Sequence, residues 1–131
     1  MKRVLLATAA LLAFSQAALA SANLDCSAQD KNVETLEIEA ITSRDGKFLA
    51  SMRGVLEIEP GQKIELTSKD LKSHHSQKNI SLVFAKRTPQ GLLEIKIYAK
   101  PVGDGDLEYE GRYEVRLGKI RKSGKVGCSA G

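Results

Sequence analysis

Two adjacent histidines are the first residues of this chain that could do chemistry. His74 and His75 are the only histidines in the sequence. Neighbouring side chains on an extended segment point to opposite sides, so the pair is poorly arranged to hold one metal ion. The sequence also has no HxH or HExxH spacing, and no motif places a nucleophile beside the pair. We therefore expect a solvated loop pair, with a weak transition-metal site or a catalytic base as the alternatives.

A short acidic segment, GDGDLEYEG, is the second candidate. Hard cations take several carboxylate oxygens, so Asp104 and Asp106 are the candidate metal ligands. Glu108 and Glu110 instead fit the wet face of a strand. Since the EF-hand spacing is absent, we expect a solvated loop, with a calcium site as the alternative. No motif requires a cofactor, and none is predicted.

The last 20 residues are strongly basic. They include only one acidic residue, Glu114, and their net charge is +5. Residues 21–111, in contrast, include 12 basic and 15 acidic residues and have a net charge of −3. This asymmetry is typical of a surface for an acidic protein or an acidic envelope polymer. The alternative is an edge strand protected by its lysines. No aromatic residue interleaves the basic run after Tyr113, so we expect no nucleic-acid partner. The candidate binding residues are Arg112, Arg116, Lys119, Arg121, Lys122 and Lys125.

The first 20 residues have the three parts of a secretory signal peptide. Lys2 and Arg3 precede an apolar run over residues 4–14, and Ala18-Leu19-Ala20 ends the segment. The run is too short to cross a bilayer, which favours a cleaved leader over an anchor and leaves no transmembrane segment. We predict a signal peptide over 1–20 and a single periplasmic or secreted domain over 21–131. Cleavage lowers the formal charge from +4 to +2.

The two cysteines, Cys26 and Cys128, lie near opposite ends of the predicted domain. An even pair in an oxidising compartment indicates a disulfide bond. Such a bond would stabilise the fold by roughly 4–5 kcal/mol in the chain-entropy model. A metal pair or free thiols are the alternatives, but no CxxC or Cys–His spacing supports a metal site.

Alternation of apolar and polar residues dominates the chain and predicts β-strands. The clearest run covers residues 107–117, and shorter runs cover 36–40, 63–66 and 93–99. No segment after residue 20 has a sustained helical stripe. We predict an all-β fold, an antiparallel β-sandwich or small barrel of six to eight short strands stapled by one disulfide.

Turn residues predict how these strands connect. A three-residue loop at Arg44-Asp45-Gly46 would place Ile38 opposite Met52. The Thr88-Pro89-Gln90-Gly91 turn would place Phe84 opposite Ile95, and Glu59-Pro60-Gly61-Gln62 forms a further turn. The polar segment 68–79 is expected to be a loop with room for one helical turn.

These features together favour an exported, non-enzymatic binding or accessory protein. It would recognise another macromolecule through its basic C-terminal edge. One alternative is a small secreted hydrolase or metal-binding protein that uses Asp104 and Asp106, or His74 and His75. The other is a structural subunit that assembles through a sheet edge.

Overall fold

The fold is built almost entirely from antiparallel strands, as the alternation predicts. A computed structural model describes residues 21–43, 49–75, 78–103 and 108–130, and the predicted leader lies outside them. The described residues form nine strands, one more than the upper limit of the predicted six to eight, and one 3₁₀ turn, η1 (Ser68–Asp70). The strands are β1 (Ser21–Ala28), β2 (Thr35–Ser43), β3 (Leu49–Glu57), β4 (Lys63–Thr67), β5 (Leu71–His75), β6 (Ile80–Thr88), β7 (Gly91–Pro101), β8 (Glu108–Leu117) and β9 (Ile120–Ala130).

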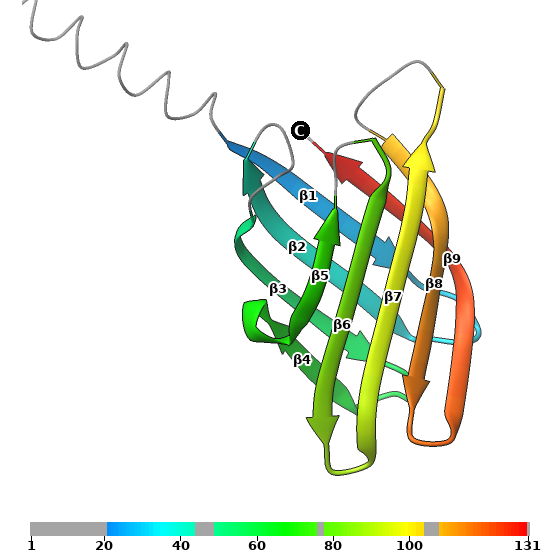
Figure 1. Cartoon of the computed structure of the whole chain (residues 1–131). Coiled ribbons are helices and arrows are strands. Elements are labelled where there is room, and N and C mark those ends of the chain that lie inside the picture. Colours follow the sequence, from blue (N-terminus) through cyan, green and yellow to red (C-terminus); the bar gives the residue numbers. More distant parts are fainter. Residues whose placement is uncertain (1–20, 44–48, 76–77, 104–107, 131) are drawn as a thin grey trace, which may run out of the picture.

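The strands form one curled sheet that nearly closes on itself as a barrel (Figure 1). Its order is β4-β3-β2-β1-β9-β8-β7-β6-β5, and every neighbouring pair is antiparallel. Every neighbouring pair joins strands that follow each other along the chain, except β1 with β9, while β4 and β5 stand at the two ends of the order. The first and last strands therefore lie in the middle of the sheet, and the middle of the chain supplies its two edges.

One face of the sheet is buried in the core and the other is exposed to solvent. On β8, every second side chain from Tyr109 is turned inward and the side chains between them are exposed. The same alternation on the other strands fills the interior with aliphatic side chains, as expected for a chain without tryptophan. The core side chains include Leu36, Ile38, Leu56, Leu66, Phe84, Ile95, Tyr113 and Val115.

A disulfide between Cys26 and Cys128 covalently links β1 to β9, which confirms the predicted bond. The two residues are directly opposite each other in the register, and both are turned into the core. Only four residue pairs join β1 to β9, whereas β1 and β2 share eight. The bond therefore reinforces a short pairing between strands that are far apart in sequence.

Two of the predicted turns are confirmed. Phe84 lies opposite Ile95, and the β6–β7 register continues to Thr88 opposite Gly91, so the strands extend to the turn itself. At the turn between β3 and β4, the N–H of Gln62 donates to the carbonyl oxygen of Glu59 at 3.1 Å.

The predicted register between β2 and β3 is wrong by two residues. Ile38 lies opposite Gly54 rather than Met52, and a further irregularity follows Ile41. The reason is a close approach: a Cβ on Gly54 would lie 2.6 Å from the Cδ1 atom of Ile38. A shift of two residues keeps the same side chains inward, so alternation alone does not detect it. The predicted loop residues Asp45 and Gly46 lie outside the described residues.

The segment 68–79 contains the expected helical turn and also a strand that its polar sequence does not reveal. The 3₁₀ turn η1 is closed by Asp70, whose Oδ2 accepts from the N–H of Thr67 at 2.9 Å. β5 follows and pairs with β6. His74 and His75 therefore lie on a strand and not on a loop, which corrects the prediction.

A buried tyrosine anchors the connection between β1 and β2 to the opposite wall. The hydroxyl of Tyr113 donates to the Asp30 carboxylate and lies 2.9 Å from both of its oxygens. The backbone N–H groups of Asn32 and Val33 also donate to Asp30. The absence of a side chain at Gly124 makes room for this contact, because a Cβ there would collide with Asp30 and Tyr113.

These contacts shift the pKa values of Asp30 and Tyr113 in opposite directions. Burial opposes the charged form of Asp30, but the hydrogen bonds from Asn32, Val33 and Tyr113 outweigh it and hold the pKa of Asp30 below its ordinary value. Burial and the hydrogen bond to Asp30 raise the pKa of Tyr113. The Asp30 contact therefore contributes stability above the ordinary aspartate pKa, and this contribution is lost as pH falls through the lowered value.

Removing the disulfide should lower the free energy of unfolding by about 4 kcal/mol, since the unfolded chain then regains the freedom of a 102-residue loop. The double variant Cys26→Ala/Cys128→Ala tests this by urea unfolding. A Ser27→Ala variant, which alters an exposed neighbour on β1, is the control and should unfold as the wild type does. An unchanged unfolding midpoint in the double variant would contradict the expectation.

Loss of the tyrosine hydroxyl should lower the free energy of unfolding at pH 7 by about 2 kcal/mol, the usual value of a hydrogen bond to a charged group. The variant is Tyr113→Phe, compared with the wild type in urea at pH 7 and pH 3. The difference should shrink at pH 3, because below the ordinary aspartate pKa the unfolded chain binds a proton at Asp30 and the contribution of the lowered pKa is progressively lost. Asp25→Asn, which removes an exposed carboxylate, is the control for charge loss. A difference that is equal at both pH values would refute the role of the Asp30 charge.

Candidate functional site

Four of the six predicted basic residues share the outer face of one hairpin. Arg112 and Arg116 lie on β8, Arg121 and Lys125 lie on β9, and all four are exposed. Alternation explains this placement, because the inward rows of both strands hold the buried side chains. We call these four residues the basic face.

The register of the hairpin sets like charges directly against each other. Arg112 lies opposite Lys125, and Arg116 lies opposite Arg121. Within the described part of the chain, none of the four forms an ion pair within 4.0 Å, although Glu94 on β7 lies opposite Arg116. Like charges at directly opposed positions destabilise a sheet. The two like-charge pairs thus cost stability, which Glu94 opposite Arg116 and Glu114 between Arg112 and Arg116 offset only in part.

The basic residues of β9 lie where the strand is paired on one side only. β9 pairs with β8 over ten residue pairs, but its four pairs with β1 involve only residues 127–130. Residues 120–126, which include Arg121, Lys122 and Lys125, therefore have no strand partner on the β1 side. Lysines protect such an edge from pairing with other chains, so edge protection stays the alternative to a binding role.

The remaining two basic residues do not belong to this face. Lys119 lies in the turn between β8 and β9 and is exposed. Lys122 falls in the inward row of β9, with Val126 and Cys128, and is half-buried. The six basic residues were predicted as one group because the sequence alone does not show which of them share a face of the hairpin.

Residues of β7 that the sequence did not single out adjoin the basic face. A shallow groove of about 450 Å³ runs across the outer side of β6–β9 and includes Lys96, Tyr98 and Arg112. Tyr98 lies opposite Arg112 and is 47% exposed. Asn79 donates to its hydroxyl at 3.0 Å, and the Lys100 ammonium lies 6.0 Å from its ring centroid. The alternation of β7, combined with its pairing to β8, could have revealed these neighbours.

The histidines do not converge on a site. His74 lies opposite the buried Leu82 and is half-buried, whereas His75 lies opposite Ser81 and is exposed. Burial lowers the pKa of His74, and the neighbouring His75 lowers it further. The two side chains differ in burial along β5, as expected for neighbouring residues on an extended segment, and the weak metal site stays a prediction.

The acidic candidates are only partly described. Asp104 and Asp106 lie outside the described residues, so the calcium alternative stays a prediction. Glu108 and Glu110 are exposed on the outer face of β8, as expected. Among the residues with described positions, no group of three histidine, cysteine or acidic side chains could hold a metal ion.

Comparisons with known proteins give no relative. No family model matches the chain, and neither a curated protein nor a solved structure matches it. Within the described ranges, no helix is long and apolar enough to cross a membrane.

Reversing one charge of the basic face should stabilise the protein. Lys125→Glu places an acid opposite Arg112, so the free energy of unfolding should rise by about 0.5 kcal/mol. Lys96→Glu is the matched control, because it places an acid opposite Glu114 and should have the reverse effect. Urea unfolding at low salt measures both, and about 1 M salt should remove both differences. A destabilising Lys125→Glu would contradict the repulsion between Lys125 and Arg112.

Proposed function

We propose that this chain is an exported, non-enzymatic protein that binds an acidic macromolecule through the basic face. The supporting observation is the pair of like-charge contacts, Arg112 with Lys125 and Arg116 with Arg121, on the β8–β9 hairpin. Natural sequences keep such repulsion where a ligand relieves it, as at sites that carry strain for function. The charges face solvent, so a partner can reach them without any change in the fold.

The spacing of the charges suits an extended polyanion or an acidic protein surface. The two pairs are four residues apart along each strand, or about 13 Å at the usual rise of a β-strand. A ligand with several negative charges can contact both pairs at once, while a single small anion cannot. Solvent-exposed charges at this spacing are screened at physiological salt, so affinity should fall steeply as salt is raised.

The groove beside the basic face supports contact over more than the four charges. Tyr98 offers an aromatic surface whose hydroxyl is held by Asn79, and Lys96 adds a further cation. Arginine and tyrosine are favoured at binding surfaces because they combine charge or hydrogen bonding with large contact area. A ligand would therefore span β7, β8 and β9.

Export is part of the same proposal. It is supported by the predicted signal peptide over residues 1–20 and by the Cys26–Cys128 disulfide, which persists in oxidising compartments. The hydrolase alternative has less support, because His74 and His75 diverge on β5 and, among the described residues, no group of three histidine, cysteine or acidic side chains could hold a metal ion. We therefore place this protein in the periplasm or the extracellular medium as a binding component.

Reversal of the basic face should abolish binding to acidic polymers. The variant carries Arg112→Glu, Arg116→Glu, Arg121→Glu and Lys125→Glu, and the probes are fluorescent poly-L-glutamate and polygalacturonate. We expect the purified wild-type protein to bind at least one probe at low salt, and the variant to lose at least about tenfold in affinity. Polyglutamate binding would indicate an acidic protein partner, and polygalacturonate binding an acidic glycan.

A second reversal variant controls for net charge. Arg53, Lys69, Lys72 and Lys78 are exposed and none of them lies on β8 or β9, and their conversion to Glu changes the net charge by the same amount. This control should keep most of the affinity. Equal losses of affinity in both variants would show that binding depends on net charge alone, and would overturn the proposed site. Unchanged affinity in the first variant would overturn it as well.

A further inference from the structure

The sheet does not close, because the strand that should close it is split. β4 pairs with β3 over residues 63–67, and β5 pairs with β6 over residues 81–84. In a sheet whose neighbours are all antiparallel, β4 and β5 run in the same direction, as two halves of one strand displaced at η1. Beyond Phe84, the segment Ala85–Thr88 pairs only with β7 and faces β4 across a gap. We call this gap the seam.

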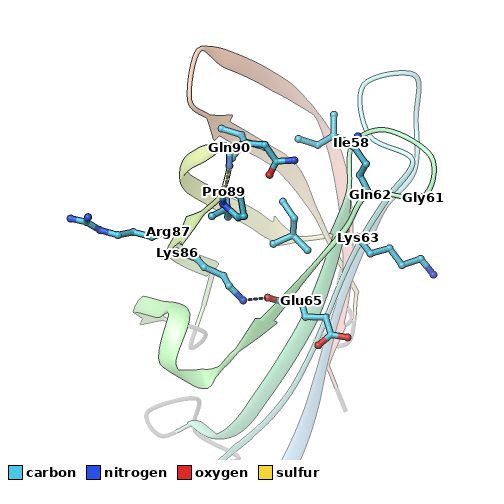
Figure 2. A pocket seen from close by; sticks show the side chains of 12 residues that line it. Ile58, Gly61, Gln62, Lys63, Glu65, Lys86, Arg87, Pro89 and Gln90 are labelled. Atoms are coloured by element: carbon cyan, nitrogen blue, oxygen red, sulfur yellow. Dashed lines mark hydrogen bonds between the residues drawn. The ribbon is translucent and has the colours of Figure 1, made fainter.

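The seam is a real pocket with an apolar floor. It has a volume of about 610 Å³ and lies between β4 and the turn from β6 to β7 (Figure 2). Ile64 on β4, Leu117 on β8 and Ile58, which directly follows β3, line the pocket. Ile58 and Ile64 pack against the core and are only half-buried. Incomplete cover of these side chains leaves apolar surface that a further chain could bury.

Both sides of the seam present unpaired strand edges. The carbonyl oxygen of Glu65 points into the gap, where it accepts from the Nζ atom of Lys86 at 2.6 Å. Backbone direction alternates along a strand, so the N–H and C=O of Lys63 point the same way. An unpaired edge of this kind is a template on which an extended segment can add as a strand.

Lys86 marks one end of the open part. It stands in the inward row of β6 after Phe84, and its ammonium reaches across to Glu65 and to Asp70, 3.9 Å away (Figure 2). An inward-pointing charge is one means by which proteins limit pairing at an edge. The part of the seam from Lys86 to the turn at Pro89 stays open.

The charges beside the seam select the kind of segment that fits. Lys63 on β4 and Arg87 on β6 extend to solvent on its two sides, and Glu65 is the only acid that lines it (Figure 2). In an added strand, alternate side chains point outward between these two cations, while the others point to the apolar floor. The seam of a second copy would bring the same cations and be repelled.

We propose that the seam binds an extended peptide segment of a partner protein by β-strand addition, with apolar residues inward and acidic residues outward. The backbone of the segment would pair with the free edge of β4. Its acidic side chains would lie beside Lys63 and Arg87. This site is separate from the basic face and does not depend on the function proposed for it.

Labelled hexapeptides and the purified protein test this inference by fluorescence anisotropy. The probe is Val-Glu-Val-Glu-Val-Glu, compared with Val-Lys-Val-Lys-Val-Lys and with the first peptide methylated at its backbone nitrogens. We expect the acidic peptide to bind, and both comparison peptides to bind at least about tenfold more weakly. Equal affinity of the methylated peptide would overturn strand addition, and absence of binding by the acidic peptide would overturn the site.

Two double variants locate the binding. Lys63→Glu/Arg87→Glu should weaken the acidic peptide at least about tenfold, while Lys69→Glu/Lys72→Glu, with the same charge change outside the seam, should keep its affinity. Arg112→Glu/Arg116→Glu should also leave peptide affinity unchanged. A loss confined to this last variant would place the peptide on the basic face, refuting the seam while leaving the proposed function intact.

Discussion

The pairing of the first strand with the last is the contact on which the rest of this structure depends. Each other neighbouring pair in the described sheet joins strands that follow each other along the chain, and such hairpins form from local sequence. Among the described strands, β1–β9 is the only strand pairing that joins the two halves of the sheet. It is short, and the Cys26–Cys128 disulfide holds it. This long-range contact decides which strands lie inside the sheet and which lie at its edges.

Both proposed binding regions follow from that pairing. Because β1 pairs with the C-terminal residues 127–130 of β9, the β8–β9 hairpin lies inside the sheet order and its exposed cations share the outer face of that hairpin. The edges must then come from the middle of the chain, where β4 and β5 are short and η1 displaces one from the other. The basic face offers charge on a fixed scaffold, whereas the seam offers backbone groups without partners. The charges of the basic face attract a ligand over long range, whereas the backbone groups of the seam act only on direct contact.

The sequence predicted what depends on local pattern and missed what depends on the register between strands. Alternation was enough to find the long strands, the core and the β6–β7 pairing, because a turn at Pro89 fixes that register directly. It failed at β2–β3, where the missing side chain of Gly54 permits a shift of two residues without moving any side chain to the wrong face. β5 was missed because LKSHH has no apolar alternation, and its strand conformation comes from the edge of β6. The basic residues were found by type, but their opposition in pairs depends on the β8–β9 register.

The disulfide has a mechanical consequence as well as a thermodynamic one. Since it joins residues 102 positions apart, nearly the whole described chain lies within one covalent ring, with only short tails outside it. A force applied to the two ends first loads the pairings of residues 21–25 and 129–130, and then passes through the sulfur atoms without loading the strands between Cys26 and Cys128. A protease that cuts one loop inside the ring opens it without releasing a fragment. A protein of this design can be pulled or nicked and still keep its strands covalently linked.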